Sequence, residues 1–323
     1  MFGKSKPTAA LPGSNAAPAM SNDILQRLAE DYMKDRKWRR LFKWAIFVLL
    51  LIYVIGLFSI AGEGPAINAG KPHTALIELS GPIGVEGGVL SDQMNNSLRR
   101  AFENKYSKGV VMRINSPGGT PVQSAEINEE ITRLRKLYPN KPMHVVVSDL
   151  CASGGYFVAV AAEKIYANRS SIVGSIGVRM DSFGFVDAMK KYGIERRSIT
   201  AGENKAILDP FLPMKPAQRA HAETMLAVVH QEFINTVKAG RGDRLADDPD
   251  LFTGLFWSGV GAKELGLIDD FGGLDYVARE VIGQENIVDY TFRPNFLEQF
   301  SRGLGVAVGT GIGKVFSGQI KLQ

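Results

Sequence analysis

The chain has 323 residues, 45% of them hydrophobic and 22% charged, so it is long enough for one large domain or two ordinary ones. Its net charge of +5 comes entirely from residues 1–43, which hold nine Lys or Arg and four Asp or Glu. The rest of the chain is neutral, and this argues against a nucleic-acid-binding domain. The single cysteine, Cys151, excludes an intramolecular disulfide and is interpreted as a small buried hydrophobe.

The N-terminal part predicts a membrane anchor. Residues 1–43 form a basic cytoplasmic segment whose first 22 residues, rich in Ala, Pro, Ser, Gly and Asn, are predicted to be disordered. Residues 44–62 then run without a charge, close to the length that spans a bilayer. Because positive charges precede this run, we expect an uncleaved anchor with a cytoplasmic N-terminus and an extracytoplasmic domain. A cleaved signal peptide is the alternative.

Beyond a linker at residues 63–73, strands and helices alternate through residues 74–294. Such alternation predicts an α/β domain with largely parallel strand pairing. Residues 295–323 form a glycine-rich tail, interpreted as flexible or surface-associated. Strands are expected at 74–80, 109–115, 143–148, 164–167, 176–180, 195–200 and 287–292, and helices at 91–104, 121–137, 153–162, 183–192, 216–240, 258–266 and 274–282.

One serine stands at a point suited to nucleophilic chemistry. Ser153 follows the β-branched run 143–148 and precedes Gly154, Gly155 and a small apolar helix. A helix start offers unpaired N–H groups, which suit a developing negative charge beside an attacking hydroxyl. Alternatively, Ser153 is an ordinary helix N-cap and the glycines allow close packing.

A second glycine loop follows the strand at 109–115. A glycine N–H from Ser116-Pro117-Gly118-Gly119 could face Ser153 across neighbouring strands and supply a second oxyanion donor. The same residues are also ordinary turn formers. No Gly-Lys-Ser/Thr follows, so the loop is not a phosphate loop.

A nucleophilic serine also requires a base. The four histidines are poor candidates, and neither a His-Glu-x-x-His motif nor a Cys/His cluster predicts a metal site. A lysine can act as the base when desolvation lowers its pKa. Lys205 stands out because it lies in an irregular loop, 201–214, with apolar residues directly after it.

Together these segments resemble peptidase family S49, the signal peptide peptidase A, protease IV and SohB-type serine proteases. The resemblance covers roughly residues 74–290. Its motifs are Asn115-Ser-Pro-Gly-Gly119, Ala152-Ser153-Gly-Gly-Tyr156, Gly174-Ser175-Ile-Gly-Val178 and the loop around Lys205.

The resemblance implies a role for each matching residue. Ser153 is the nucleophile, Lys205 the general base, and Gly119 and Gly154 the oxyanion-hole amides, while Ser175 orients the lysine. It implies a Clp/crotonase-like spiral of ββα units and a homo-oligomeric, membrane-mounted ring, with no cofactor and no metal. Cys151, the apolar residues after Lys205 and the glycine-rich tail are departures from the family pattern.

These observations predict a single-pass serine endopeptidase with a Ser/Lys dyad at the outer face of the cytoplasmic membrane. The resemblance implies that its substrates are cleaved signal peptides and other membrane or secreted polypeptides, with no nucleic-acid partner. One alternative is a non-catalytic, membrane-anchored scaffold or regulator on a peptidase-like fold. Another is an acyl-CoA enzyme on the related crotonase fold, against which the outward orientation weighs.

Overall fold

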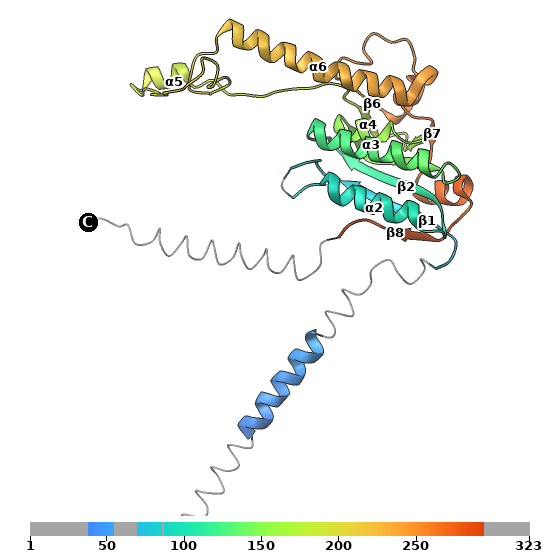
Figure 1. Ribbon diagram of the computed structural model, residues 1–323. Helices are drawn as coiled ribbons and strands as arrows, with labels where there is room; N and C mark the ends of the chain where they lie inside the picture. Colours follow the sequence, from blue (N-terminus) through green and yellow to red (C-terminus); the bar gives the residue numbers. More distant parts are fainter. Residues whose placement is uncertain (1–37, 55–69, 86, 294–323) are drawn as a thin grey trace, which may run out of the picture. The chain divides into compact units, whose positions relative to one another are not determined.

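The computed structural model describes residues 38–54, 70–85 and 87–293. The chain divides into two compact units between Glu63 and Gly64, and each is described by itself. In the first unit, residues 38–54 are helical (Figure 1). Within the described ranges, no helix combines the length and apolar character needed to cross a membrane. The second half of the predicted anchor, residues 1–37 and the glycine-rich tail lie outside these ranges.

The second unit is built on an eight-stranded sheet in which every pairing is parallel except that of β5 with β6. The strands follow the order β6-β5-β3-β2-β1-β8, and β4 lies off this path between β3 and β7. This arrangement confirms the predicted α/β class. The strands are β1 (His73–Ser80), β2 (Ser107–Ser116), β3 (Met143–Ala152), β4 (Lys164–Ala167), β5 (Ile172–Gly174), β6 (Phe256–Ser258), β7 (Asp270–Phe271) and β8 (Ile287–Asp289).

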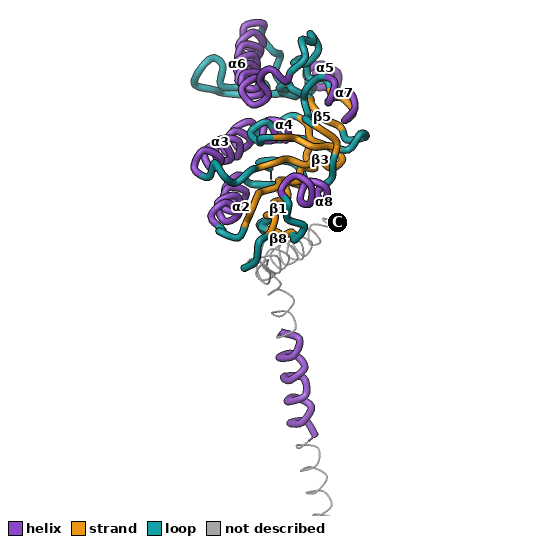
Figure 2. Tube along the Cα trace, turned by 90° about the vertical axis from the view of Figure 1, so that its right-hand side faces the viewer, coloured by secondary structure: helices purple, strands orange, loops and turns teal. Residues whose placement is uncertain are grey.

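Helices cover both faces of the sheet. Figure 2 shows α2, α3 and α4 on one face and α8 on the other. The π-helical turn η2 continues α8 and places Val277 against Val111 and Val146. The helices are α2 (Ser91–Glu103), α3 (Pro121–Leu137), α4 (Gly154–Ala159), α5 (Val186–Lys191), α6 (Pro216–Arg241), α7 (Gly259–Glu264) and α8 (Leu274–Tyr276), with η1 (Gly242–Arg244) and η2 (Val277–Ile282).

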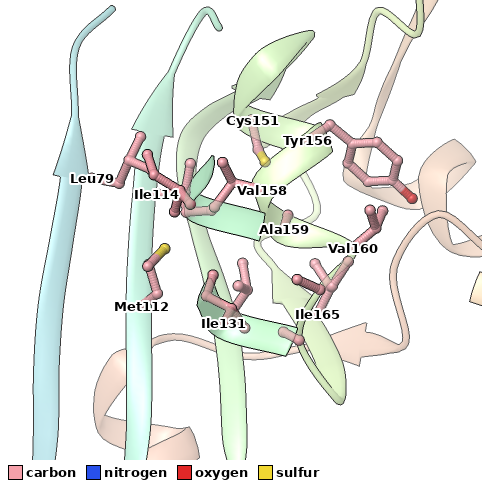
Figure 3. Close-up of a cluster of buried hydrophobic side chains, with 14 of the residues drawn as sticks. Leu79, Met112, Ile114, Ile131, Cys151, Tyr156, Val158, Ala159, Val160 and Ile165 are labelled. Carbon is pink, nitrogen blue, oxygen red and sulfur yellow. The ribbon is translucent and has the colours of Figure 1, made fainter. Parts of the chain in front are cut away.

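The main hydrophobic core lies between the sheet and helices α2 to α4 (Figure 3). Central parallel strands are buried on both faces, which explains the continuous β-branched runs of β2 and β3. Cys151 and Tyr156 both point into this core, and burial raises the pKa of the Cys151 thiol. The interpretation of Cys151 as a buried hydrophobe is therefore confirmed.

Strand β3 changes partner along its length, and this determines where Ser153 lies. Its first part pairs with β4, from His144 to Val147, and its last part pairs with β5, from Leu150 to Ala152. The strand therefore extends four residues beyond the predicted end at residue 148. Ser153, which directly follows the strand, therefore lies beside β5 and not beside β4.

Two predicted strands differ in the structure, and two short strands were not predicted. The strand expected at 195–200 does not form, and the strand expected at 176–180 lies at β5 instead. The short strands β6 and β7 were not expected. Residues 195–200 are exposed and do not pair with the sheet, and a sequence pattern alone cannot supply a pairing partner.

A buried charge network fixes the C-terminal end of α6 to the sheet. Arg241, 2% exposed, donates from Nη1 to Asp269 Oδ2 at 2.7 Å and from Nε to the Gly266 carbonyl at 2.8 Å. Arg244 Nη1 and the Ile165 amide also donate to the Asp269 carboxylate, at 2.9 and 2.7 Å. Burial alone would raise the pKa of Asp269, but these donors outweigh it and hold the pKa below its usual range.

Asp269→Asn is expected to lower the free energy of unfolding by about 3 kcal/mol at pH 7, because it leaves Arg241 buried without its counter-charge. The folded-state pKa of Asp269 lies below the unfolded value, so its contribution is present above about pH 4 and is lost as the pH falls further. Urea denaturation of the full-length wild type and Asp269→Asn variant should show that the difference between their free energies of unfolding becomes smaller from pH 6 to pH 3. Asp187→Asn, at an exposed site on α5, is the matched control. A difference in unfolding free energy that stays constant across this pH range would contradict a stabilising role for the ionised Asp269 carboxylate.

Candidate functional site

Ser153 occupies a strained position between β3 and α4. Its backbone has φ 51° and ψ −123°, in a region that non-glycine residues rarely adopt. The backbone is held there because the Ser153 N–H donates to the Gly174 carbonyl at 2.9 Å and its own carbonyl accepts from Phe157 at 2.9 Å. Its hydroxyl makes no capping hydrogen bond to α4. The ordinary N-cap interpretation therefore does not account for this serine.

The glycine loop after β2 lies directly against Ser153. A Cβ atom built on Gly118 would lie 2.6 Å from the Gly154 nitrogen and 2.7 Å from Ser153 Cβ. One built on Gly154 would lie 3.1 Å from the Gly119 nitrogen. The structure thus brings Gly119, Gly154 and Ser153 together, although they come from two neighbouring strands.

Both glycine amides are free to bind a ligand. Among the described residues, neither the Gly119 N–H nor the Gly154 N–H donates a hydrogen bond. Ile83, in the loop after β1, holds Gly119 in place: its N–H donates to the Gly118 carbonyl at 2.9 Å, and its carbonyl accepts from Thr120 at 3.0 Å. Two unpaired N–H groups beside an uncommitted hydroxyl form the arrangement that stabilises a developing oxyanion.

Two residues that frame this site had no signal in the sequence. A Cβ on Gly119 would overlap the Ile83 carbonyl, and a Cβ on Gly154 would overlap Ser124 Oγ. Ser124 donates to the Thr120 carbonyl at 3.0 Å and lies on the first turn of α3. Only the three-dimensional contacts explain why glycine is required at positions 119 and 154.

Ser175 follows β5 and is close to Ser153 through the backbone. It has φ 53°, and its N–H donates to the Leu255 carbonyl at 2.7 Å. The residue before it, Gly174, supplies the carbonyl that binds the Ser153 amide. Ser175 is therefore one residue from the backbone contact that fixes the serine, and its side chain is only partly buried.

Lys205 lies elsewhere within a single chain, on a projecting segment. We call residues 179–229 the arm; in Figure 1, α5 is at its outer end, away from α4 and the sheet. The loop around Lys205 is attached to the arm itself. The Phe185 N–H donates to the Pro210 carbonyl at 2.7 Å, and Gln218 Nε2 donates to Asn204 Oδ1 at 3.1 Å. The Lys205 side chain is exposed, and no hydrogen bond among the described residues joins it to Ser153.

Three of the four histidines make contacts elsewhere in the fold, and the fourth, His221, is exposed on α6. His73 bridges the Lys71 carbonyl and the Tyr290 hydroxyl at 2.7 and 3.0 Å. His144 is buried against Tyr166, its Nδ1 lacks a partner, and burial lowers its pKa. His230 Nε2 lies 3.2 Å from the Ile176 carbonyl. Within residues 38–54, 70–85 and 87–293, no group of three or more His, Cys, Asp or Glu could hold a metal ion.

Comparison with known proteins identifies relatives over most of the chain. The model of peptidase family S49 matches residues 135–287. A Methanocaldococcus jannaschii protein with a provisional protease name is 34% identical over 299 residues, which are 86% of this chain and 95% of that protein. Protease 4 of Haemophilus influenzae is 31% identical over 204 residues, 60% of this chain and 32% of that protein.

A Brucella abortus protein named Na(+)/H(+) antiporter NhaA is 46% identical over 188 residues. That match covers 58% of this chain but 25% of the Brucella protein, so this chain spans a quarter of that protein's length. The archaeal relative, in contrast, aligns over nearly its whole length, and the family model includes Ser153, Ser175 and Lys205. The chain belongs to peptidase family S49.

Proposed function

We propose that this protein is a serine endopeptidase that uses Ser153 as its nucleophile. The observation that carries the proposal is that Ser153, with a strained backbone and no capping hydrogen bond from its hydroxyl, lies beside the unpaired amides of Gly119 and Gly154. The printed protease names of the M. jannaschii and H. influenzae relatives support the same reaction class. A strained backbone at a reacting residue is one way in which a fold presents a side chain in a fixed direction.

The proposed reaction proceeds through an acyl-enzyme. Neutral Lys205 takes the proton of Ser153 Oγ, which attacks the carbonyl carbon of the scissile peptide bond. The Gly119 and Gly154 N–H groups bind the resulting oxyanion. The Lys205 ammonium then gives its proton to the leaving amine as the C–N bond breaks. Water, deprotonated by Lys205, hydrolyses the acyl-enzyme, and Ser175 orients the lysine.

Because Lys205 lies on the arm, we propose that it serves the Ser153 of a neighbouring copy of the chain. Large apolar side chains are exposed along the arm, as expected for a surface that another copy covers: Met180, Phe183, Phe185, Tyr192, Ile194, Ile199, Phe211, Met214, Met225 and Val228. Ile199 is fully exposed and Phe183 is 77% exposed in one chain. Head-to-tail contacts of this kind close into a ring, which agrees with the oligomer that the family resemblance implies.

We also propose a location and a substrate class. The uncharged run 44–62 supports a single-pass anchor in the cytoplasmic membrane, with an extracytoplasmic peptidase domain from 74 to 294. At this location, the proposed substrates are cleaved signal peptides and other membrane or secreted polypeptides. The proposed topology of the domain is a Clp/crotonase-like spiral. Sealed vesicles of known orientation test the topology: protease added outside should digest residues 74–294 only where that face is exposed.

The second candidate is a non-catalytic, membrane-anchored scaffold. The observation that favours it is that, among the described residues, no hydrogen bond joins Ser153 to the exposed Lys205 within one chain. A fluorophosphonate probe separates the two functions, since it reacts with an activated serine and not with a resting hydroxyl. Labelling at Ser153 supports the peptidase, whereas an unlabelled full-length oligomer supports the scaffold.

Gly118→Ala tests the geometry of the glycine loop. Gly118 has φ +99°, and the added methyl group would press on the Gly154 nitrogen and Ser153 Cβ, so we expect kcat to fall by about 100-fold. Gly81→Ala is the matched control, because Gly81 has φ +90° but open space around a built Cβ. Both variants bear a similar backbone cost, of about 1–2 kcal/mol. Equal losses of peptidase activity in the two variants would contradict the assigned geometry.

A further inference from the structure

A pocket lies at the carboxyl ends of β4 and β7, beside residues 147–149 of β3. Its volume is about 450 Å³. The walls include Ser148 and Asp149 of β3, Asn168 and Arg169 after β4, and Phe271 of β7. None of Ser153, Gly119, Gly154 and Ser175 lines it. Crevices at the carboxyl ends of parallel strands are common ligand sites in α/β sheets.

Two side chains of opposite charge line this pocket without pairing to each other. Asp149 Oδ2 accepts a hydrogen bond from Asn115 Nδ2 at 3.2 Å, but no cation among the described residues lies within ion-pair distance. The Arg169 guanidinium stacks over the Phe271 ring, with Cζ 4.3 Å from the centroid. No carboxylate in the described part of the chain pairs with it.

The neighbouring charges are already matched. Lys263 Nζ, 4.9 Å from the Phe271 ring centroid, pairs with Asp270 Oδ1 at 2.5 Å, and Asp269 is bound by Arg241 and Arg244. The remaining pocket walls are uncharged: Val147, Ser148, Ala167, Asn168, Phe271, Gly272 and Gly273. Asp149 and Arg169 are therefore the two charges that a ligand in this pocket would meet.

We propose that this pocket binds a small zwitterion, a free dipeptide or amino acid, with its ammonium group on Asp149 and its carboxylate on Arg169. A simple anion would be repelled by Asp149, and a simple cation by Arg169, whereas a zwitterion satisfies both. The volume is in the range of small-molecule sites. The aromatic platform under Arg169 fixes the guanidinium direction and leaves its N–H fork free for a carboxylate.

The site goes beyond the proposed peptidase function, because binding requires neither Ser153 nor Lys205. The pocket is nevertheless joined to the active site by the chain: Asp149 lies in β3, four residues before Ser153, which directly follows this strand. Its other wall is tied to the start of β5, where Ser171 Oγ donates to the Ser148 carbonyl and accepts from the Asn168 amide at 3.0 Å. Peptide hydrolysis releases products of this zwitterionic class.

Calorimetric titration of the full-length Ser153→Ala chain with L-alanyl-L-alanine tests the site without hydrolysis. We expect saturable one-site binding that weakens at least tenfold when the dipeptide is N-acetylated or C-amidated. In an added Arg169→Gln background, free and C-amidated dipeptide should bind equally. In an added Asp149→Asn background, free and N-acetylated dipeptide should bind equally. Arg279→Gln, at an exposed arginine paired with Glu280, is the control and should bind as the parent does.

Several results would overturn the proposal. These are no saturable binding, equal binding of free and doubly capped dipeptide, or binding of inorganic phosphate alone that depends on Arg169. Loss of binding in wild-type chain labelled with fluorophosphonate at Ser153 would place the dipeptide in the active site instead. Circular dichroism of each variant excludes misfolding as the cause. Failure here leaves peptidase activity untouched, so the two proposals are tested separately.

Discussion

Ser153→Ala is expected to lower peptidase activity by about 10⁴-fold or more, leaving only the small rate enhancement that substrate binding and the oxyanion donors provide. The Ser153 hydroxyl oxygen is the atom that forms the acyl-enzyme, and Ser153 adjoins both glycine segments that carry the Gly119 and Gly154 amides. The measurement is cleavage of a fluorogenic peptide by the full-length protein. Fold and assembly are checked by circular dichroism and by size.

The matched control is Ser170→Ala, at an exposed turn serine whose loss should leave activity within about twofold. Mass spectrometry of the fluorophosphonate-treated wild type should place the adduct on Ser153 alone. An adduct on another serine, or a Ser153→Ala protein with full activity, would show that the strained backbone at position 153 serves only the fold.

Lys205→Arg is expected to inactivate the protein about as completely as Ser153→Ala, since a guanidinium stays protonated and cannot accept the serine proton. The substitution keeps the positive charge and most of the side-chain length on the arm, so assembly should be preserved. Lys191→Arg, on α5 of the same arm, is the control and should retain activity. Peptide cleavage and oligomer size are measured together for each variant.

A different outcome would redefine the role of Lys205. If Lys205→Arg stays active while Lys205→Ala does not, the residue contributes charge to substrate binding or to assembly, and the base lies elsewhere. Three of the histidines offer little replacement, because His73 and His230 bind backbone carbonyls and His144 is buried in β3, whereas His221 is exposed on α6.

The sequence predicted the fold class and most elements, for physical reasons that particular segments illustrate. Helix α3 begins and ends where expected, at Pro121 and Leu137, because proline favours a first turn and the apolar spacing is helical. The extent of β3 was underestimated, since residues 149–152 carry a charge and small side chains. They form a strand only because β5 is beside them.

The candidate site was predictable as a set of residues but not as a geometry. The resemblance to family S49 identified Gly119 and Gly154 as possible donors, yet the contacts of Ile83 and Ser124 with these glycines depend on the approach of distant segments. The positive φ of Ser153 cannot be read from its residue type, since serine ordinarily avoids that region. Lys205 lies on the arm, whose α5 is away from α4 and the sheet in Figure 1, and no local sequence pattern encodes this projection.

Mixing two inactive full-length variants tests the central claim, a nucleophile and a base contributed by different copies of the chain. Ser153→Ala retains Lys205, and Lys205→Arg retains Ser153, so a mixed ring contains junctions with both groups intact. Random assembly of equal amounts should restore about a quarter of wild-type activity, since each junction needs the right variant on both sides. A co-assembled mixture that stays as inactive as either variant alone would contradict the account.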